Sequence, residues 1–188
     1  MVCRLRNIMK LKKINIRKDK ALRKKVKGLY REAFPPEERL PWWLLRLNAT
    51  RRDIDLDAWL ADESFCGMTA SVTVEGMHFL LFFAVAQERR GSGFGSAILT
   101  QLRQNYASVT LNVEPLLPDA PNLQQRERRF SFYRRNGLYD TGWYVWEVGG
   151  KFRVLSTAPE LDVPTYKKVF RKLSLGFWNV KLKEEKRS

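Results

Sequence analysis

A glycine-rich stretch, placed between an apolar run and a helical pattern, is the part of the sequence best suited to chemistry. Residues 85–99 read Val-Ala-Gln-Glu-Arg-Arg-Gly-Ser-Gly-Phe-Gly-Ser-Ala-Ile-Leu. Glycines let main-chain amides turn toward one point, and a helix that begins there adds free N–H groups and the positive end of its dipole. Arg90 adds a guanidinium that suits phosphate oxygens. The stretch therefore predicts a seat for a pyrophosphate.

Three nucleotide-binding patterns compete for this stretch, and spacing separates them. A P-loop ends in Gly-Lys-Ser/Thr, whereas Gly95 is followed by Ser-Ala. A dinucleotide-binding fingerprint needs a third glycine at the position of Ile98. Its acidic residue, about 20 residues further on, is matched by Glu114. The remaining pattern, Arg/Gln-x-x-Gly-x-Gly/Ala, is met by residues 90–95.

The elements that must position this stretch begin with a strand and two helices. Residues 12–16 alternate in polarity, as in a half-buried strand. Asp19 is suited to cap a helix that runs to about Ala33. The proline pair that follows must end this helix, because proline lacks an N–H donor and restricts the residue before it. A short apolar helix is expected over residues 42–47.

Three successive strands are expected next, and the third leads into the glycines. They cover about residues 54–61, 65–74 and 77–85, separated by turn-forming residues as in antiparallel neighbours. Residues 79–85 are apolar throughout, which indicates a strand buried on both faces in mid-sheet.

The second half of the chain alternates helices and strands. A helix over residues 97–106 connects to a strand over 109–113, which should pair in parallel with the strand before the glycines. A basic helix follows, closed by Gly137. That basic helix covers residues 123–135. The elements after it are a hairpin of strands at 139–148 and 151–156 around Gly149-Gly150, a last helix at about 163–175, and a basic tail.

The positive charge lies at the two ends of the chain. The 188 residues are 44% hydrophobic, enough for one substantial core, and the net charge is +15. Residues 1–40 hold 14 Lys/Arg against 4 Asp/Glu, and residues 167–188 hold 8 against 2. Such runs are typical of solvated helix faces, and they are also typical of surfaces that bind RNA or the ribosome.

Several classes of protein are not indicated. Cys3 and Cys66 are far apart and His78 is the single histidine, so no disulfide framework or metal site is predicted. His78, beside a turn, is expected to be structural or exposed. No apolar run approaches the roughly 20 residues of a membrane helix. We therefore expect a cytoplasmic protein, a monomer or a homodimer, with no membrane partner.

With these elements in place, the sequence resembles the GNAT superfamily of N-acetyltransferases, in particular its small bacterial members. The family's coenzyme loop, Val-x-x-x-x-Arg-Gly-x-Gly-x-Gly, is matched over residues 85–95. Residues 132–138 resemble the family's Phe-Tyr-x-x-x-Gly-Phe, and residues 33–39 resemble a segment found near the acceptor site of many members. The order of elements over about residues 11–157 is also the family's.

The resemblance implies a fold and a donor. The fold is mixed α/β: a mostly antiparallel sheet of about seven strands with helices on both faces, in a single N-acetyltransferase domain over residues 1–188. The donor is acetyl-coenzyme A, with no metal. The residues implied for coenzyme binding are Phe83, Ala84, Val85, Arg90, Gly91, Ser92, Gly93, Phe94, Gly95 and Ser96.

The resemblance also implies catalytic roles. Tyr133 occupies the family's position for the acid that protonates the leaving thiolate. A base must deprotonate the acceptor amine; Glu114, at the end of a strand, is the first candidate and Glu38 the second. One departure is Arg126, which replaces an Asn that faces the coenzyme in the family.

The acceptor is expected to be an amine on a small molecule or peptide. Glu37, Glu38, Trp42 and the segment around Tyr166 are expected to line its cleft. Two other interpretations stay open: a basic RNA- or ribosome-binding module that uses the two ends of the chain, and a protein that binds coenzyme without transferring the acetyl group.

Overall fold

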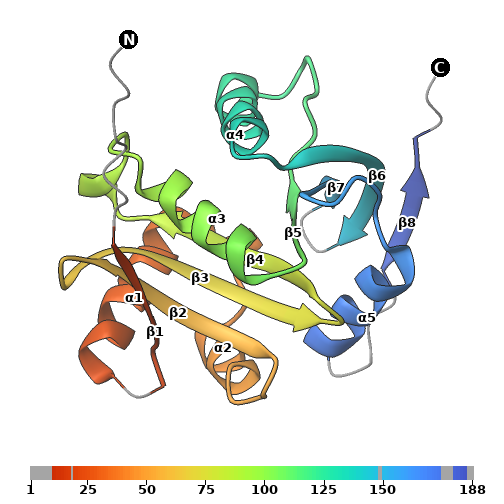
Figure 1. The fold of residues 1–188 in the computed structure, drawn as a ribbon. Helices are drawn as coiled ribbons and strands as arrows, with labels where there is room; N and C mark the ends of the chain where they lie inside the picture. The colour runs from red at the N-terminus through yellow and green to blue at the C-terminus, as the bar shows by residue number, and fades with distance from the viewer. Residues whose placement is uncertain (1–9, 18, 148–149, 175–179, 186–188) are drawn as a thin grey trace, which may run out of the picture.

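Eight strands form one twisted sheet in the computed structural model, which describes residues 10–17, 19–147, 150–174 and 180–185 (Figure 1). The strand order is β1-β2-β3-β4-β5-β7-β6-β8. The strands are β1 (Leu11–Asn15), β2 (Ile54–Ala61), β3 (Ser64–Val74), β4 (Met77–Val85), β5 (Ser108–Val113), β6 (Tyr139–Glu147), β7 (Gly150–Ser156) and β8 (Lys181–Glu184).

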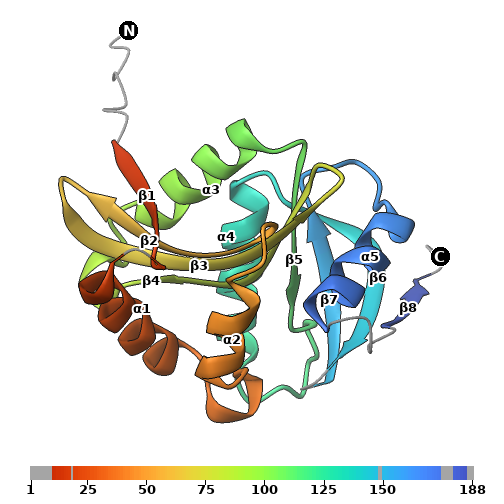
Figure 2. The same ribbon diagram turned by 90° about the horizontal axis from the view of Figure 1, so that it is seen from below.

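Two groups of helices cover the two faces of this sheet. Helices α1, α2 and α5 pack on one face, and α3 and α4 pack on the other (Figures 1 and 2). The helices are α1 (Lys20–Ala33), α2 (Trp42–Asn48), α3 (Phe94–Asn105), α4 (Leu123–Arg135) and α5 (Val163–Leu173), with single 3₁₀ turns η1 (Pro36–Glu38) and η2 (Gln87–Arg89). The mixed α/β fold class expected from the sequence is confirmed.

The pairing of β4 with β5 is the one parallel pair among the described strands; the other pairs are antiparallel. The expected parallel pairing is thus confirmed. Since α3 connects β4 to β5 on one face, the chain must cross over that face between them.

Local signals account for the ends of several helices. Asp19 caps α1, its side chain accepting a hydrogen bond from the main-chain N–H of Leu22. Gly137 follows α4 with φ of 78°, the left-handed conformation expected after a helix. One face of α1 is buried, as its apolar spacing predicts, at Leu22, Val26, Leu29 and Tyr30.

Two elements differ from the sequence-based expectation. Helix α3 begins at Phe94, three residues earlier than expected, because Gly93 serves as its N-cap residue. Residues 181–184, assigned to a basic tail, form strand β8 along the edge of β6. Only Leu182 of β8 packs on the core, so the apolar signal was too weak to predict a strand. Gly149 of the expected hairpin lies outside the described residues.

No helix in the described part of the chain is long and apolar enough to span a membrane.

Candidate functional site

The sheet opens where β4 and β5 separate. Their parallel pairing covers only Met77–Leu80 of β4 and Ser108–Leu111 of β5. Beyond Leu80, β4 continues to Val85 and stays paired with β3. One cavity lies between the diverging strands, and a second lies beside it at the end of β4.

The glycine loop, residues 90–96, follows η2 and includes the first residues of helix α3. Gly93 has φ of 86°, a conformation that residues with a side chain rarely adopt. The first hydrogen bond within α3 runs from the Ala97 N–H to the Gly93 oxygen, at 3.0 Å. The N–H groups of residues 94–96 precede that bond and lie at the positive end of the helix dipole. This geometry suits an anion.

Arg90 lies in the loop with both ends of its guanidinium engaged. Its Nε donates to the main-chain oxygen of Val85 at 3.1 Å, and its Nη2 pairs with the Glu32 carboxylate at 3.2 Å. Both side chains of the ion pair are about half exposed, so the pair is weak and an incoming anion can compete for Arg90.

A cavity of about 540 Å³, which we call the loop cavity, lies against the glycine loop. It is bounded by the end of β4, the loop and one side of α4. Its lining includes nearly all the residues expected to bind coenzyme: Phe83, Ala84, Val85, Arg90, Gly91, Gly93, Phe94, Gly95 and Ser96, together with Arg89, Phe132 and Arg135. Ser92 is the one expected residue that does not line it.

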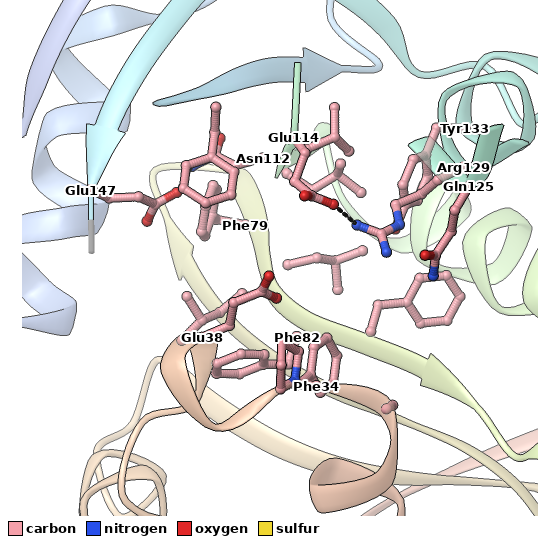
Figure 3. Close-up of a pocket in the computed structure, with 18 of the residues that line it drawn as sticks. Phe34, Glu38, Phe79, Phe82, Asn112, Glu114, Gln125, Arg129, Tyr133 and Glu147 are labelled. Atoms are coloured by element: carbon pink, nitrogen blue, oxygen red, sulfur yellow. Dashed lines mark hydrogen bonds and ion pairs between the residues drawn. The ribbon is translucent and has the colours of Figure 1, made fainter. Parts of the chain in front are cut away.

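A second cavity of about 330 Å³, the central cavity, lies in the opening between β4 and β5. Phenylalanines from the end of α1, β4 and β7 form much of its wall. Three carboxylates also line it: Glu38 of η1, Glu114 directly after β5, and Glu147 of β6. Figure 3 shows these carboxylates on different sides of the cavity, with Phe34 and Phe82 next to Glu38 and Phe79 near Asn112. An apolar body with a positively charged group would fit such a lining.

Three residues, Phe83, Arg129 and Tyr133, line both cavities. The two spaces therefore meet at the α4 helix. Tyr133 is 8% exposed, and burial raises the pKa of its phenol to about 12. A buried phenol with this pKa keeps its proton throughout the neutral range and can act as a proton donor.

Glu114, the first candidate for a base, is held by two arginines of α4. One carboxylate oxygen pairs with Arg126 at 2.8 Å and the other with Arg129 at 2.9 Å. Asn122 also donates to the Arg126-bound oxygen, at 3.4 Å. Arg126, the residue that departs from the family's pattern, thus contacts Glu114 here. The role of Glu114 as base stays a prediction, and its oxygens are already engaged.

Glu38, the second candidate, lines the central cavity and makes no ion pair with the residues that the structure describes. Burial, followed by the nearby charge of Glu114, raises the pKa of its carboxyl group. Glu37 and Trp42, expected beside it, line neither cavity. Trp42 packs instead near Tyr30, with ring centroids 5.9 Å apart, and Glu37 is exposed.

Sequence analysis missed a carboxylate in this cavity, Glu147 at the end of β6. It accepts a hydrogen bond from Asn112 Nδ2 at 2.8 Å, and burial raises the pKa of its carboxyl to about 7. Tyr166 of α5, fully buried, donates to Asn112 Oδ1 at 2.9 Å. A single Glu at the end of an alternating strand carries no motif, so no signal in the sequence singled it out.

His78 is structural, as expected. It is 1% exposed, stacks on Tyr106 with ring centroids 3.8 Å apart, and its Nδ1 lies 3.0 Å from Thr73 Oγ1. Within the described residues, no group of three or more His, Cys, Asp or Glu side chains is arranged to hold a metal ion.

Comparison with solved structures identifies the architecture. A GNAT-family acetyltransferase from Bacteroides thetaiotaomicron superposes with a TM-score of 0.69 over 90% of this chain and 100% of that one, at 22% identity. The chain has the GNAT fold. An aminoglycoside 6'-N-acetyltransferase in complex with coenzyme A matches with a TM-score of 0.62 at 16% identity, over 82% of this chain and 100% of its own.

A third GNAT enzyme, the ribosomal-protein-alanine N-acetyltransferase from Escherichia coli, matches with a TM-score of 0.56 at 15% identity, over 81% of this chain and 96% of its own. Neither a protein-family model nor a curated protein matches the sequence. At these identities the likeness establishes the fold, and the activity has to be argued from the site.

Proposed function

We propose that this protein is an N-acetyltransferase that moves an acetyl group from acetyl-coenzyme A to a primary amine by direct attack. The observation that carries the proposal is the meeting of two cavities at Tyr133: one lies against the glycine loop, whose geometry suits an anion, and the other is lined by carboxylates. The first suits the coenzyme and the second suits a cationic acceptor.

In this proposal the glycine loop holds the pyrophosphate. The N–H groups at the start of α3 and the Arg90 guanidinium supply the donors. The pantetheine arm runs along the end of β4, near Phe83, Ala84 and Val85, where the free side of the strand faces the opening left by β5. This path brings the thioester toward the junction of the two cavities.

The chemistry requires stabilisation of an oxyanion and protonation of a thiolate. Main-chain N–H groups near Val85 serve the oxyanion that forms when the amine attacks the carbonyl carbon. When the C–S bond breaks, its electron pair goes to sulfur, and Tyr133 donates a proton to that sulfur. Burial raises the pKa of a thiol as well as that of a phenol, so the buried thiolate is a better proton acceptor than a thiolate in water.

The acceptor is a primary amine on a small molecule or a peptide, bound in the central cavity. The names of two matched enzymes give different acceptors, an aminoglycoside and a protein alanine. We propose neither of these acceptors for this chain. In this proposal the enzyme works in the cytoplasm.

The test measures coenzyme binding and transfer separately. Acetyl-coenzyme A should raise the melting temperature of the wild-type protein, and the double variant Arg90→Ala with Gly93→Asp should abolish that rise. Release of free thiol in the presence of a panel of primary amines then tests transfer. A melting temperature that the coenzyme leaves unchanged, together with RNA binding that weakens steeply with salt, would favour a basic RNA-binding module instead. Coenzyme binding without thiol release would leave a non-catalytic coenzyme binder.

A further inference from the structure

Of the three carboxylates in the central cavity, Glu147 is the one held in a defined orientation with no ion pair among the described residues. It is the last residue of β6. The other charged side chains that line the cavity are Glu38 of η1, Glu114 directly after β5 and Arg129 of α4. Asn112 of β5 lies beside Glu147 (Figure 3), and its side chain also contacts Tyr166 of α5.

A short relay fixes the orientation of this carboxylate. The buried Tyr166 hydroxyl donates to Asn112 Oδ1 at 2.9 Å, which leaves Asn112 Nδ2 to donate to Glu147 Oε1 at 2.8 Å. Burial raises the pKa of the Tyr166 phenol well above its usual range, so the phenol keeps its proton and remains a donor. The amide of Asn112 therefore presents its N–H to Glu147, and the second carboxylate oxygen is left for a ligand.

The other two carboxylates are less suited to accept a proton. Both oxygens of Glu114 already accept from arginines, at 2.8 and 2.9 Å. Glu38 lies on a single 3₁₀ turn, and among the described contacts no hydrogen bond fixes its carboxylate. A general base acts best when it is positioned near the amine and its pKa is close to the working pH. Glu147 lines the central cavity with its carboxylate oriented by Asn112, and burial raises its pKa to about 7.

We propose that Glu147 is the general base of the transfer reaction, with Asn112 and Tyr166 as its positioning residues. This inference rests on the proposed function and names a residue for the step that function leaves open. The acceptor it implies is an amine that arrives as an ammonium ion and lies in the central cavity with its nitrogen toward the end of β6.

Two protons leave the ammonium nitrogen in the course of the reaction. Glu147 takes one proton from the ammonium, and the free amine then attacks the thioester carbon. As the C–N bond forms, the nitrogen gives up a second proton, and the sulfur takes one from Tyr133 as the C–S bond breaks. The nitrogen's second proton restores the Tyr133 phenol, and Glu147 releases its proton to solvent. The products are the amide, the free thiol and one proton.

The experiment compares pH profiles. Phenethylamine and 1,4-diaminobutane serve as probe amines, and kcat/KM is measured from pH 5.5 to 9 by thiol release. We expect an acidic limb near pH 7 in the wild type. Glu147→Gln should lower kcat/KM at least 100-fold and remove that limb, while acetyl-coenzyme A still raises the melting temperature. Glu114→Gln should keep the limb, and the exposed Glu160→Gln should behave as the wild type.

The positioning residues are tested in the same assay. Asn112→Ala and Tyr166→Phe should lower kcat about 10-fold and shift the acidic limb, whereas a merely structural role would leave the limb in place. A Glu147→Gln variant with kcat/KM within threefold of the wild type, or with an unchanged limb, would overturn the proposal.

A second readout does not depend on turnover. In protein labelled with ¹³C at glutamate carboxyls, the resonance missing from Glu147→Gln is assigned to Glu147, and it should titrate near pH 7 and move when a probe amine is added. If the wild type binds acetyl-coenzyme A but releases no thiol with either amine or with the wider panel of primary amines, the transferase proposal fails on its own. A Glu147 resonance that no amine moves would refute the role of Glu147.

Discussion

The Arg90 side chain donates from Nε to the main-chain oxygen of Val85, 3.1 Å away, while Nη2 of the same guanidinium binds Glu32 at 3.2 Å. Val85 is among the residues that the family resemblance implies for coenzyme binding. In the structure Arg90 occupies the oxygen, and Glu32 of α1 holds Arg90 in place. Both interactions must loosen if the guanidinium is to turn toward a phosphate.

Removing the charge of Glu32 should therefore tighten coenzyme binding. We expect Glu32→Gln to lower the dissociation constant of acetyl-coenzyme A by roughly two- to fivefold, because the half-exposed ion pair that competes for Arg90 is worth at most about 1 kcal/mol. Isothermal titration calorimetry measures this change. Arg90→Ala should weaken binding, and in the Arg90→Ala background the Glu32 substitution should have no effect. Weaker binding in Glu32→Gln alone would show that Glu32 supports the site.

Tyr133→Phe should separate chemistry from binding. The phenyl ring preserves the packing at the junction of the cavities, but the proton donor is lost, so kcat should fall by about 100-fold. The rise in melting temperature with acetyl-coenzyme A should stay within a degree or so of the wild-type value. Phe130→Leu on the same helix is a matched control that should keep kcat. An unchanged kcat in Tyr133→Phe would assign the proton to another donor.

Gly67 of β3 lies where a side chain cannot fit. A Cβ at this position would be 2.8 Å from the main-chain oxygen of Ala84 on β4, and main chain in mid-sheet cannot move away cheaply. Gly67→Ala should lower the free energy of unfolding by about 1–3 kcal/mol, measured by urea denaturation. Gly28 in α1 has open space around its Cβ position, so Gly28→Ala should instead stabilise by roughly 0.5–1 kcal/mol. Equal effects of the two substitutions would contradict this account.

Buried His78 should make stability depend on pH. Burial, followed by the charge of Lys13, lowers the pKa of His78 from 6.5 to about 3. Its contribution is therefore fully present above pH 6.5 and is lost as the pH falls toward 3, because only the unfolded chain binds the proton readily. Asp57 acts in the opposite direction: burial raises its pKa from 3.8 to about 6, so its contribution is present at low pH and is lost as the pH rises through 6.

The two effects are separated by comparing His78→Phe with the wild type. The difference in unfolding free energy, wild type minus variant, should fall by about 1 kcal/mol per pH unit below pH 6.5, since Asp57 is common to both proteins. Urea denaturation at pH 4.5, 5.5, 6.5 and 7.5 provides the measurement. A difference that stays constant over this range would mean that His78 titrates normally in the folded protein.

Much of the fold was predictable because its signals are local. The period of the apolar residues gave α1 and the strands from β2 to β4, and single residues such as Asp19 and Gly137 marked helix ends. The glycine loop was predictable for the same reason, since the left-handed conformation of Gly93 is a property of one residue. These features depend little on what packs around them.

The composition of the central cavity was not predictable in the same way. Glu147, Asn112 and Tyr166 lie on β6, β5 and α5, and only the order of strands in the sheet brings them together. Likewise the ion pairs of Glu114 depend on where α4 lies over β5. Strand β8 was not predicted because only one of its residues is apolar and faces the core, and because its register is set by pairing with β6.

Strand β8 has a practical consequence for anyone who shortens the chain. Its residues pair with Trp143 to Trp146 of β6, and β6 ends in Glu147. Ending the protein after residue 174 would strip that cover and leave a row of unsatisfied amides and carbonyls beside two tryptophans, an arrangement that invites self-association. A truncated protein would then aggregate more readily and would hold Glu147 less firmly, although every residue of both cavities would still be present.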